Sequence, residues 1–155
     1  MAAERRLEAL GIVLPAAPAP AAAYVPAVRT GDLMFVSGQI AVGSGGLVAA
    51  GKVGAGVDLA SAVACARHCA LNLLAQLRTA LGTLDRVTRI VKLTVFVASD
   101  PSFTAQHLVA DGASQLLVSV FGDAGRHARS AVGVPALPLG SPVEVDAVVE
   151  VTGGA

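Results

Sequence analysis

The chain has 155 residues, a formal net charge of zero, 54% hydrophobic residues and only 14% charged residues. The neutral charge, with four Phe, one Tyr and no Trp, argues against nucleic acid as a partner, and no uncharged apolar run approaches the roughly 20 residues of a membrane-spanning helix. The opening MAAERRLEALGIVLP mixes acids with bases and lacks the continuous apolar core of a secretory signal, so we expect a cytoplasmic protein with reduced thiols.

The low charge content also bears on assembly. A single domain of this length has a large surface relative to its volume, and so few charges leave much of that surface apolar. Other copies of the chain could cover it, because obligate oligomer interfaces resemble a protein core cut in half. We therefore expect a homo-oligomer.

An N-terminal segment of residues 1–23 precedes the domain, which we expect to span residues 24–155. Leu7 and Leu10 stand at helical spacing and Gly11 follows as a stop signal, which predicts a short helix. The Ala/Pro stretch PAAPAPAAA cannot hold a regular helix and is expected to run extended over the surface.

The domain begins with an expected hairpin, two strands within YVPAVRTGDLMFVSGQIAV that are joined at Thr30-Gly31-Asp32. After a glycine-rich loop, the clearest helix runs from Val57 to Leu81, with Asp58 as its N-cap and Gly82 just past its end. Apolar residues recur along it at three- and four-residue steps and predict a buried stripe. The opposite side is expected to be polar, with Asp58, Ser61, Cys65, His68, Asn72, Gln76 and Thr79.

The second half of the chain alternates strands and one helix. VTRIVKLTVFVAS is rich in β-branched residues and predicts a strand. A helix is expected from Asp100, its N-cap, with Pro101 in the first turn, to about Phe121. Two last strands cover Arg129 to Val134 and Val143 to Val151. The order β-β-α-β-α-β-β predicts an α+β domain with both helices on one face of a mixed sheet.

Three charged residues stand out in these last two strands. Alternation in the final strand turns its odd-numbered residues toward the helices, whereas Glu144 and Asp146 point to the other face, a candidate for subunit packing. Arg129 opens the preceding strand. Because such charges are costly to bury unless they are satisfied, they either face water or have a function.

Four stretches resemble the RidA (YjgF) superfamily, also called the L-PSP endoribonuclease family. HARSAVGVPALPLGSPVEVDAV is similar to its closing signature, and FVSGQIAV is similar to its Ser-Gly-Gln-Ile strand end. Tyr24 matches an early tyrosine, and IVKLTVFVASDPSF matches the central strand and the turn after it. The resemblance covers roughly Tyr24 to Val151 and points to a divergent branch.

The resemblance implies a chorismate-mutase-like α+β domain that assembles as a homotrimer, with sites in clefts between subunits. It also implies hydrolysis of reactive enamines and imines, such as 2-aminoacrylate, to 2-keto acids and ammonia, with no metal or organic cofactor. Two other functions stay open: a non-catalytic trimer that binds small carboxylates such as 2-keto acids, and, against the neutral charge, an endoribonuclease.

The resemblance also assigns roles to individual residues. Arg129 would bind the substrate carboxylate through two parallel hydrogen bonds, and Glu144 would position or deprotonate the attacking water. Gly38 would let the backbone approach the ligand, and Tyr24 would close the cleft. His107 takes the place of a family asparagine, where it could bind substrate or simply face solvent or an interface. The competing interpretation is an Arg129–Glu144 ion pair that joins two strands.

Several neighbouring residues depart from the family pattern or have two interpretations. Ala131 replaces a frequent cysteine, and Gly133 replaces a larger residue, which suggests a wider pocket. Arg126 and His127 could form an anion-attracting rim or solvate a turn, and Asp146 is expected at the interface. Cys65, His68 and Cys69 cluster on one helix, but zinc needs further ligands, so we interpret them as packed side chains.

Overall fold

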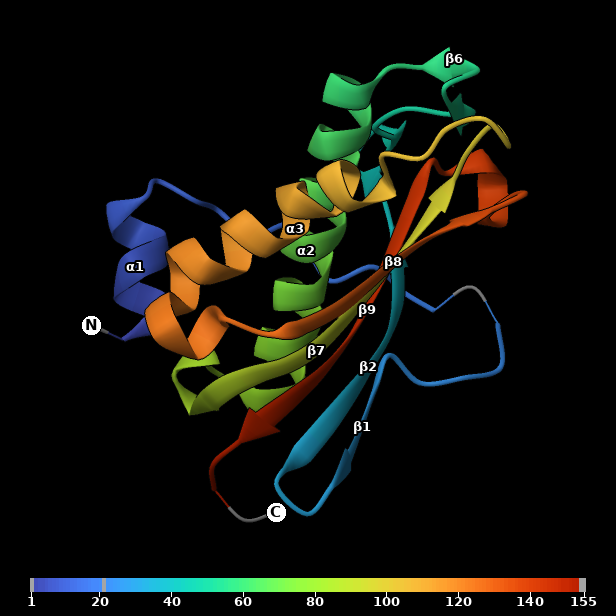
Figure 1. Ribbon diagram of the computed structural model, residues 1–155. Helices are drawn as coiled ribbons and strands as arrows, with labels where there is room; N and C mark the ends of the chain where they lie inside the picture. The colour runs from blue at the N-terminus through green and yellow to red at the C-terminus, as the bar shows by residue number, and fades with distance from the viewer. Residues whose placement is uncertain (1, 21, 154–155) are drawn as a thin grey trace.

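Five strands form one mixed sheet in the order β1-β2-β9-β7-β8, and three helices lie on one side of it in the computed structural model, which describes residues 2–20 and 22–153 (Figure 1). The helices are α1 (Ala3–Ala9), α2 (Leu59–Leu81) and α3 (Gln106–Phe121). The sheet strands are β1 (Ala27–Thr30), β2 (Leu33–Ile40), β7 (Val87–Ala98), β8 (Ala128–Val134) and β9 (Val143–Val151). This arrangement confirms the predicted α+β class with a mixed sheet.

Short elements fill the connections. The glycine-rich loop after β2 contains two small pairs, β3 (Val42–Gly43) with β4 (Gly46–Leu47) and β5 (Lys52–Val53) with β6 (Gly56–Val57). Single 3₁₀ turns follow at η1 (Leu84–Arg86), η2 (Gly122–Gly125) and η3 (Pro138–Gly140). In the large sheet only β7 and β8 pair in parallel, and α3 makes the crossover that a parallel pair requires.

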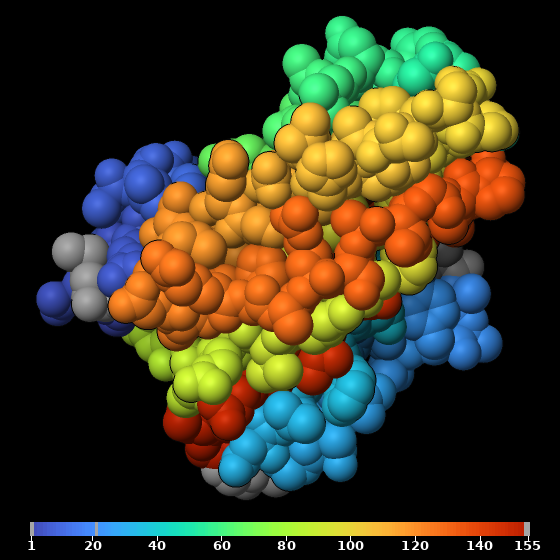
Figure 2. All heavy atoms as spheres, in the orientation of Figure 1, coloured from blue at the N-terminus to red at the C-terminus, as the bar shows by residue number. Residues whose placement is uncertain are grey.

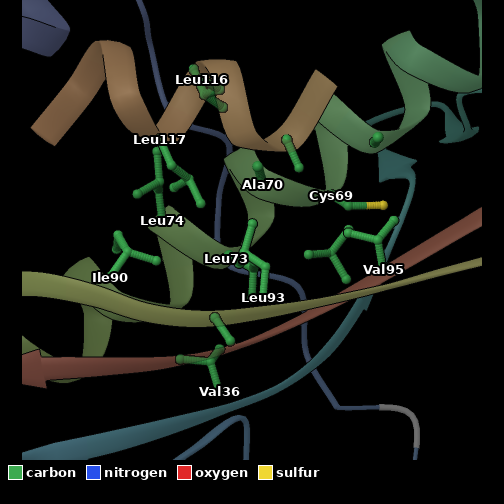
Figure 3. Close-up of a cluster of buried hydrophobic side chains, with 14 of the residues drawn as sticks. Val36, Cys69, Ala70, Leu73, Leu74, Ile90, Leu93, Val95, Leu116 and Leu117 are labelled. Atoms are coloured by element: carbon green, nitrogen blue, oxygen red, sulfur yellow. The ribbon is translucent and has the colours of Figure 1, made fainter. Parts of the chain in front are cut away.

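The core lies between the sheet and α2 and α3 (Figure 3). Leu73 and Leu74 of α2 meet Ile90 and Leu93 of β7, and Leu117 of α3 closes the layer; all five side chains are almost fully buried. The predicted alternation of β9 is confirmed, because Val143, Val145, Ala147, Val149 and Val151 are all buried.

The opposite face of the sheet carries no helix and is mixed, with Glu144 and Asp146 on β9 and large apolar side chains on other strands. Val28 of β1 pairs with Phe35 of β2, and Phe35 pairs with Val148 of β9, so these side chains share this open face. Val28, Phe35 and Val132 of β8 are about half exposed, at 53%, 47% and 44%. We call this surface the open face.

Helix α2 has the predicted caps, but its polar side is partly buried. The Asp58 carboxylate accepts a hydrogen bond from the Ser61 N–H at 2.8 Å, and Gly82 closes the helix in the left-handed region at φ 82°. Asn72 and Gln76, two residues of the predicted polar side, are buried. Their side chains donate to carbonyl oxygens of other segments, and these hydrogen bonds offset the free-energy cost of burying polar groups.

Helix α3 begins at Gln106 and not at Asp100, so the predicted N-cap is wrong. The Asp100 carboxylate accepts hydrogen bonds from the backbone N–H and the hydroxyl of Ser102, at 2.9 and 2.6 Å. The Phe103 N–H also donates to the Asp100 carbonyl. Asp100 therefore folds a tight turn before the helix, and Ala105 occupies the N-cap position without a side-chain cap.

The N-terminal segment packs on the other elements. Leu7 of α1 is 2% exposed and belongs to the core, and Glu4 forms an ion pair with Arg78 of α2 at 2.6 Å. Residues 13–20 then run without regular secondary structure, and the Pro18 carbonyl accepts a hydrogen bond from Gln76 Nε2 at 2.6 Å. We call residues 13–20 the strap.

Two features of the described residues bear on function classes. No helix among them is long and apolar enough to cross a membrane. Residues 2–20 and 22–153 also contain no group of three or more His, Cys, Asp or Glu side chains arranged to hold a metal ion. Cys65 and Cys69 are fully buried thiols, and burial raises the pKa of both.

Candidate active site

A pocket of about 1000 Å³ lies along β2 beyond the end of β1 and brings together Tyr24, Gly38 and Glu144. The strap and the segment before Tyr24 form one wall, and α2 forms another. The remaining lining residues come from β2 and the segment after it, from α2 and from η3: Gln39, Ile40, Val42, Gly43, Ser44, His68, Leu71, Asn72, Gln76, Pro138 and Leu139.

Glu144 reaches this pocket from β9, beside Ile40 of β2, on the open face. A register shift between Val36 and Gln39 interrupts the β2–β9 pairing and places Gly38 under the carboxylate. A Cβ atom at Gly38 would overlap Glu144 Oε1 and would lie 2.8 Å from its Cδ. Only glycine fits there; the close approach in the structure is to Glu144, and the predicted approach to a ligand stays a prediction.

The electrostatic surroundings of Glu144 favour its protonated form more than water does. Burial raises the pKa of the Glu144 carboxyl above its ordinary value, and the negative charge of the nearby Asp146 raises it further. A carboxyl whose pKa lies closer to neutrality is better suited to exchange protons with a substrate at physiological pH.

Tyr24 lines the same pocket as Glu144 and is positioned by the chain that follows it. The Ser37 N–H donates to the Pro26 carbonyl at 2.8 Å, and the Ser37 hydroxyl donates to the Val25 carbonyl at 3.0 Å. These bonds fix residues 25 and 26 to β2 directly before Gly38. The Tyr24 side chain is 48% exposed at the mouth of the pocket.

The polar side chains that α2 directs to the pocket are occupied by backbone carbonyls. His68 Nε2 lies 2.9 Å from the Val42 oxygen, and Asn72 Nδ2 donates to the Ile40 and Val42 oxygens at 3.1 and 2.9 Å. Since a carbonyl only accepts, His68 donates from Nε2. These bonds tie α2 to the end of β2 and use the donors of Asn72, whereas its buried Oδ1 has no hydrogen-bond partner among the described residues.

Arg129 lies outside this pocket. It pairs with Leu93, which points to the helices, so its side chain also lies on the helix side of β8, the outer strand. Figure 2 shows α3 and β8 next to each other on this side of the molecule. Arg129 Nη1 forms an ion pair with Asp111 at 2.8 Å and donates to Ser114 Oγ at 3.1 Å, and Nη2 donates to the His107 carbonyl at 3.0 Å.

Helix α3 therefore holds the guanidinium of Arg129 without occupying all of its N–H donors. It has five N–H donors, of which these three bonds take three, and Nε has no hydrogen-bond partner among the described residues. Within the chain, Arg129 pairs with Asp111 rather than with Glu144, which projects from the other face of the sheet. Within one chain, Arg129 and the Glu144 pocket are therefore separate.

His107 and His127 have different environments. The His107 side chain is exposed, and only its backbone carbonyl contacts Arg129, by accepting the hydrogen bond from Nη2. His127 turns inward: its Nδ1 lies 2.6 Å from the Gly125 carbonyl, and its Nε2 lies 2.9 Å from Ser114 Oγ. Burial lowers the pKa of His127, and the charge of Arg129 lowers it further. Arg126 is exposed and pairs with Asp123 at 3.4 Å.

Gly133 does not widen the pocket within the chain. A Cβ atom there would lie 2.9 Å from both Gln106 Nε2 and Ser99 Oγ, so the start of α3 occupies that space. Sequence reasoning missed Asp111 and Ser114, the side chains that hold Arg129. The position of Asp111, one helical turn after His107 on α3, is the signal that could have found it.

Comparisons with known proteins agree with this fold. Residues 4–151 match the family model described as "YjgF/chorismate mutase-like, putative endoribonuclease". Protein TCP17 from Trypanosoma cruzi is 54% identical over 145 residues, which are 93% of this chain and 91% of that protein.

Two crystal structures extend the similarity to three dimensions. Protein Atu1372 from Agrobacterium tumefaciens has a TM-score of 0.88 and 48% identity, and the match covers 97% of this chain and 92% of that chain. A structure from Shewanella oneidensis MR-1 has a TM-score of 0.93 and 34% identity, with 97% and 100% of the two chains covered. The chain belongs to the YjgF/RidA family, on a divergent branch together with TCP17 and Atu1372.

Proposed function

We propose that the protein is a homotrimer that hydrolyses reactive enamine and imine intermediates to 2-keto acids and ammonia, at sites built from two neighbouring subunits. The observation that carries this proposal is the division of the site within one chain. Glu144 lies over Gly38 in an open pocket, whereas Arg129 stands on the outer strand with unused donors. Residues on opposite faces of one sheet can act on a single substrate when a second copy supplies one of them.

The open face supports the assembly. Val28, Phe35 and Val132 are large apolar side chains that remain about half exposed on the face of the sheet that carries no helix. Burying such side chains against another copy would stabilise an oligomer by roughly 25 cal/mol per Å² of apolar surface removed from water. The trimer would also account for the low charge content of the chain.

The proposed reaction divides the work between the two half-sites. Arg129 of one subunit binds the carboxylate of a 2-imino acid through its remaining N–H donors, which fixes the imine carbon near Glu144 of its neighbour. A 2-aminoacrylate enamine first takes a proton from solvent on its terminal carbon and loses an N–H proton to solvent, which gives the imine. Tyr24 then closes the site against bulk water.

Glu144 carries the protons in the hydrolysis. It takes a proton from water as the oxygen bonds to the imine carbon, and the imine nitrogen gains a proton from solvent, which gives a carbinolamine. Glu144 then gives its proton to that nitrogen, the C–N bond breaks, and the hydroxyl gives its proton to solvent as the keto group forms. Ammonia leaves. These steps require only water and side chains, and general acid–base catalysis of this kind contributes roughly 10²–10⁴-fold.

A coupled assay tests the proposal. A serine or threonine dehydratase generates the imino acid, and release of the 2-keto acid is followed with the wild type, Arg129→Ala and Arg126→Ala. Arg126 is the matched control because it is a neighbouring exposed arginine. We expect the wild type and Arg126→Ala to accelerate release and Arg129→Ala to lose the effect.

Equal release with all three proteins and without protein would contradict the deaminase proposal. The non-catalytic alternative then predicts saturable binding of a 2-keto acid, measurable by calorimetry, that Arg129→Ala abolishes.

A further inference from the structure

We propose that the strap makes the site selective for imino acids with long apolar side chains, so that such compounds rather than 2-aminoacrylate are the preferred substrates. The choice of reaction rests on the proposed function, whereas the choice of side chain rests on the pocket alone. The relevant part of the pocket extends away from Glu144 and lies under the strap.

The first argument is size. The pocket has a volume of about 1000 Å³, the upper end of the range of roughly 300–1,000 Å³ in which proteins bind drug-sized ligands. A small imino acid such as 2-iminopropanoate, placed with its imine carbon beside Glu144, would leave most of this volume unused. A substrate with a longer side chain would extend from Glu144 toward the strap.

The second argument is the chemistry of the walls. The strap contributes only Val, Leu, Pro and Ala, and Ile40, Val42 and Leu71 face it across the pocket. The polar side chains that α2 adds to the pocket are His68, Asn72 and Gln76; each donates to a backbone oxygen, and the unpartnered Asn72 Oδ1 is buried. Far from Glu144, a ligand therefore meets aliphatic surface, which favours an apolar side chain over a polar one.

The third argument is that the wall is already formed. Before the strap, α1 is anchored by the buried Leu7 and by the Glu4–Arg78 ion pair. Within the strap, Gln76 holds the Pro18 carbonyl at 2.6 Å. After it, Ser37 holds the carbonyls of residues 25 and 26. A wall that is fixed before the ligand arrives does not have to be ordered on binding, so contact with it raises affinity directly.

The test compares imino acids that differ only in side chain. A D-amino acid oxidase produces them from D-alanine, D-norvaline and D-leucine, and their hydrolysis is followed as loss of the imine that semicarbazide can trap. For the wild type we expect kcat/KM to rise about fourfold per added methylene, the effect of burying each one in an apolar site. The readout is the ratio of kcat/KM for the leucine imine to that for the alanine imine.

Two strap variants and one control connect this ratio to the pocket. Ala17 lines the pocket, so Ala17→Phe should fill it and lower the ratio toward one, and Ala17→Val should give an intermediate ratio. Ala64→Phe makes the same change on the exposed side of α2, outside the pocket, and should keep the wild-type ratio. Two outcomes would overturn the inference. In one, the wild type has a kcat/KM ratio of the leucine imine to the alanine imine of one or less; in the other, Ala17→Phe has the same ratio as the wild type.

Failure of the reaction is distinguishable from failure of the selectivity. If no imine is hydrolysed, the deaminase proposal fails, and calorimetry with pyruvate and 4-methyl-2-oxopentanoate tests the pocket directly. Tighter binding of the branched keto acid, lost in Ala17→Phe and kept in Ala64→Phe, would support the inference. Equal affinities, or no binding of either keto acid, would overturn it.

Discussion

The Glu144 carboxylate lies directly over the backbone of Gly38, so closely that a Cβ atom at Gly38 would lie 2.8 Å from Glu144 Cδ. Gly38→Ala must therefore displace the carboxylate from the pocket wall. We expect this variant to lose at least tenfold in kcat for imine hydrolysis, because a displaced general base loses most of its contribution. The coupled dehydratase assay measures this loss.

Gly45→Ala is the matched control. A Cβ atom at Gly45 would meet nothing within 4 Å, and the residue has no positive φ. It should keep wild-type activity. Wild-type kcat in Gly38→Ala, with its fold intact by circular dichroism, would contradict the role given to Glu144.

The Asp111–Arg129 pair leads to a prediction about substrate affinity. Asp111→Asn removes the charge that holds Nη1 and leaves the guanidinium less well positioned, so we expect KM to rise several-fold with a smaller change in kcat. Because both side chains are partly exposed, the free energy of unfolding should fall by less than about 1 kcal/mol. Asp123→Asn breaks the exposed pair with Arg126 and is the control. A several-fold fall in kcat with unchanged KM would contradict a positioning role for Asp111.

Much of the fold followed from local periodicity. The alternation of β9 and the caps of α2 depend on residues close in sequence, so they could be predicted and were confirmed. The start of α3 was wrong for the same local reason: Asp100 can cap a helix or fold back on Ser102, and the sequence does not distinguish these outcomes.

The site was less predictable because it depends on partners distant in sequence. The burial of Asn72 and Gln76 requires carbonyls from β2 and the strap, which meet α2 only in the folded chain. The surroundings of Arg129 follow from its register against Leu93 of β7. The register between two distant strands cannot be predicted from the sequence of either strand alone.

Asn72 should be important for stability. Asn72→Ala removes two hydrogen bonds and leaves the partly buried carbonyl of Ile40 without this donor, whereas the Val42 carbonyl keeps His68. We expect the free energy of unfolding to fall by roughly 1–3 kcal/mol, the cost of unsatisfied buried polar groups. Urea denaturation measures it, with Gln115→Ala on the exposed face of α3 as control. A change of less than a few tenths of a kcal/mol would show that water replaces the lost donor.

The open face makes a prediction about assembly. Light scattering coupled to size exclusion should give three times the chain mass of 15.4 kDa for the wild type. Phe35→Asp places a charge at the centre of the apolar surface and should shift the protein to lower mass. Leu10→Asp, at an equally exposed apolar residue just after α1, should keep the wild-type mass. A monomeric wild type would contradict the proposed trimer.

His127 predicts a specific dependence of stability on pH. Burial lowers its pKa from the ordinary value of 6.5, so below pH 6.5 the unfolded chain binds a proton that the folded chain does not. The free energy of unfolding should therefore fall as the pH drops from 6.5 toward the folded pKa. Urea denaturation between pH 7.5 and 5.5, at intervals of about half a unit, should show a steeper fall for the wild type than for His127→Gln. His107→Gln, at an exposed imidazole, is the control and should keep the wild-type slope. Identical slopes for the wild type and His127→Gln would show that His127 is protonated equally in both states.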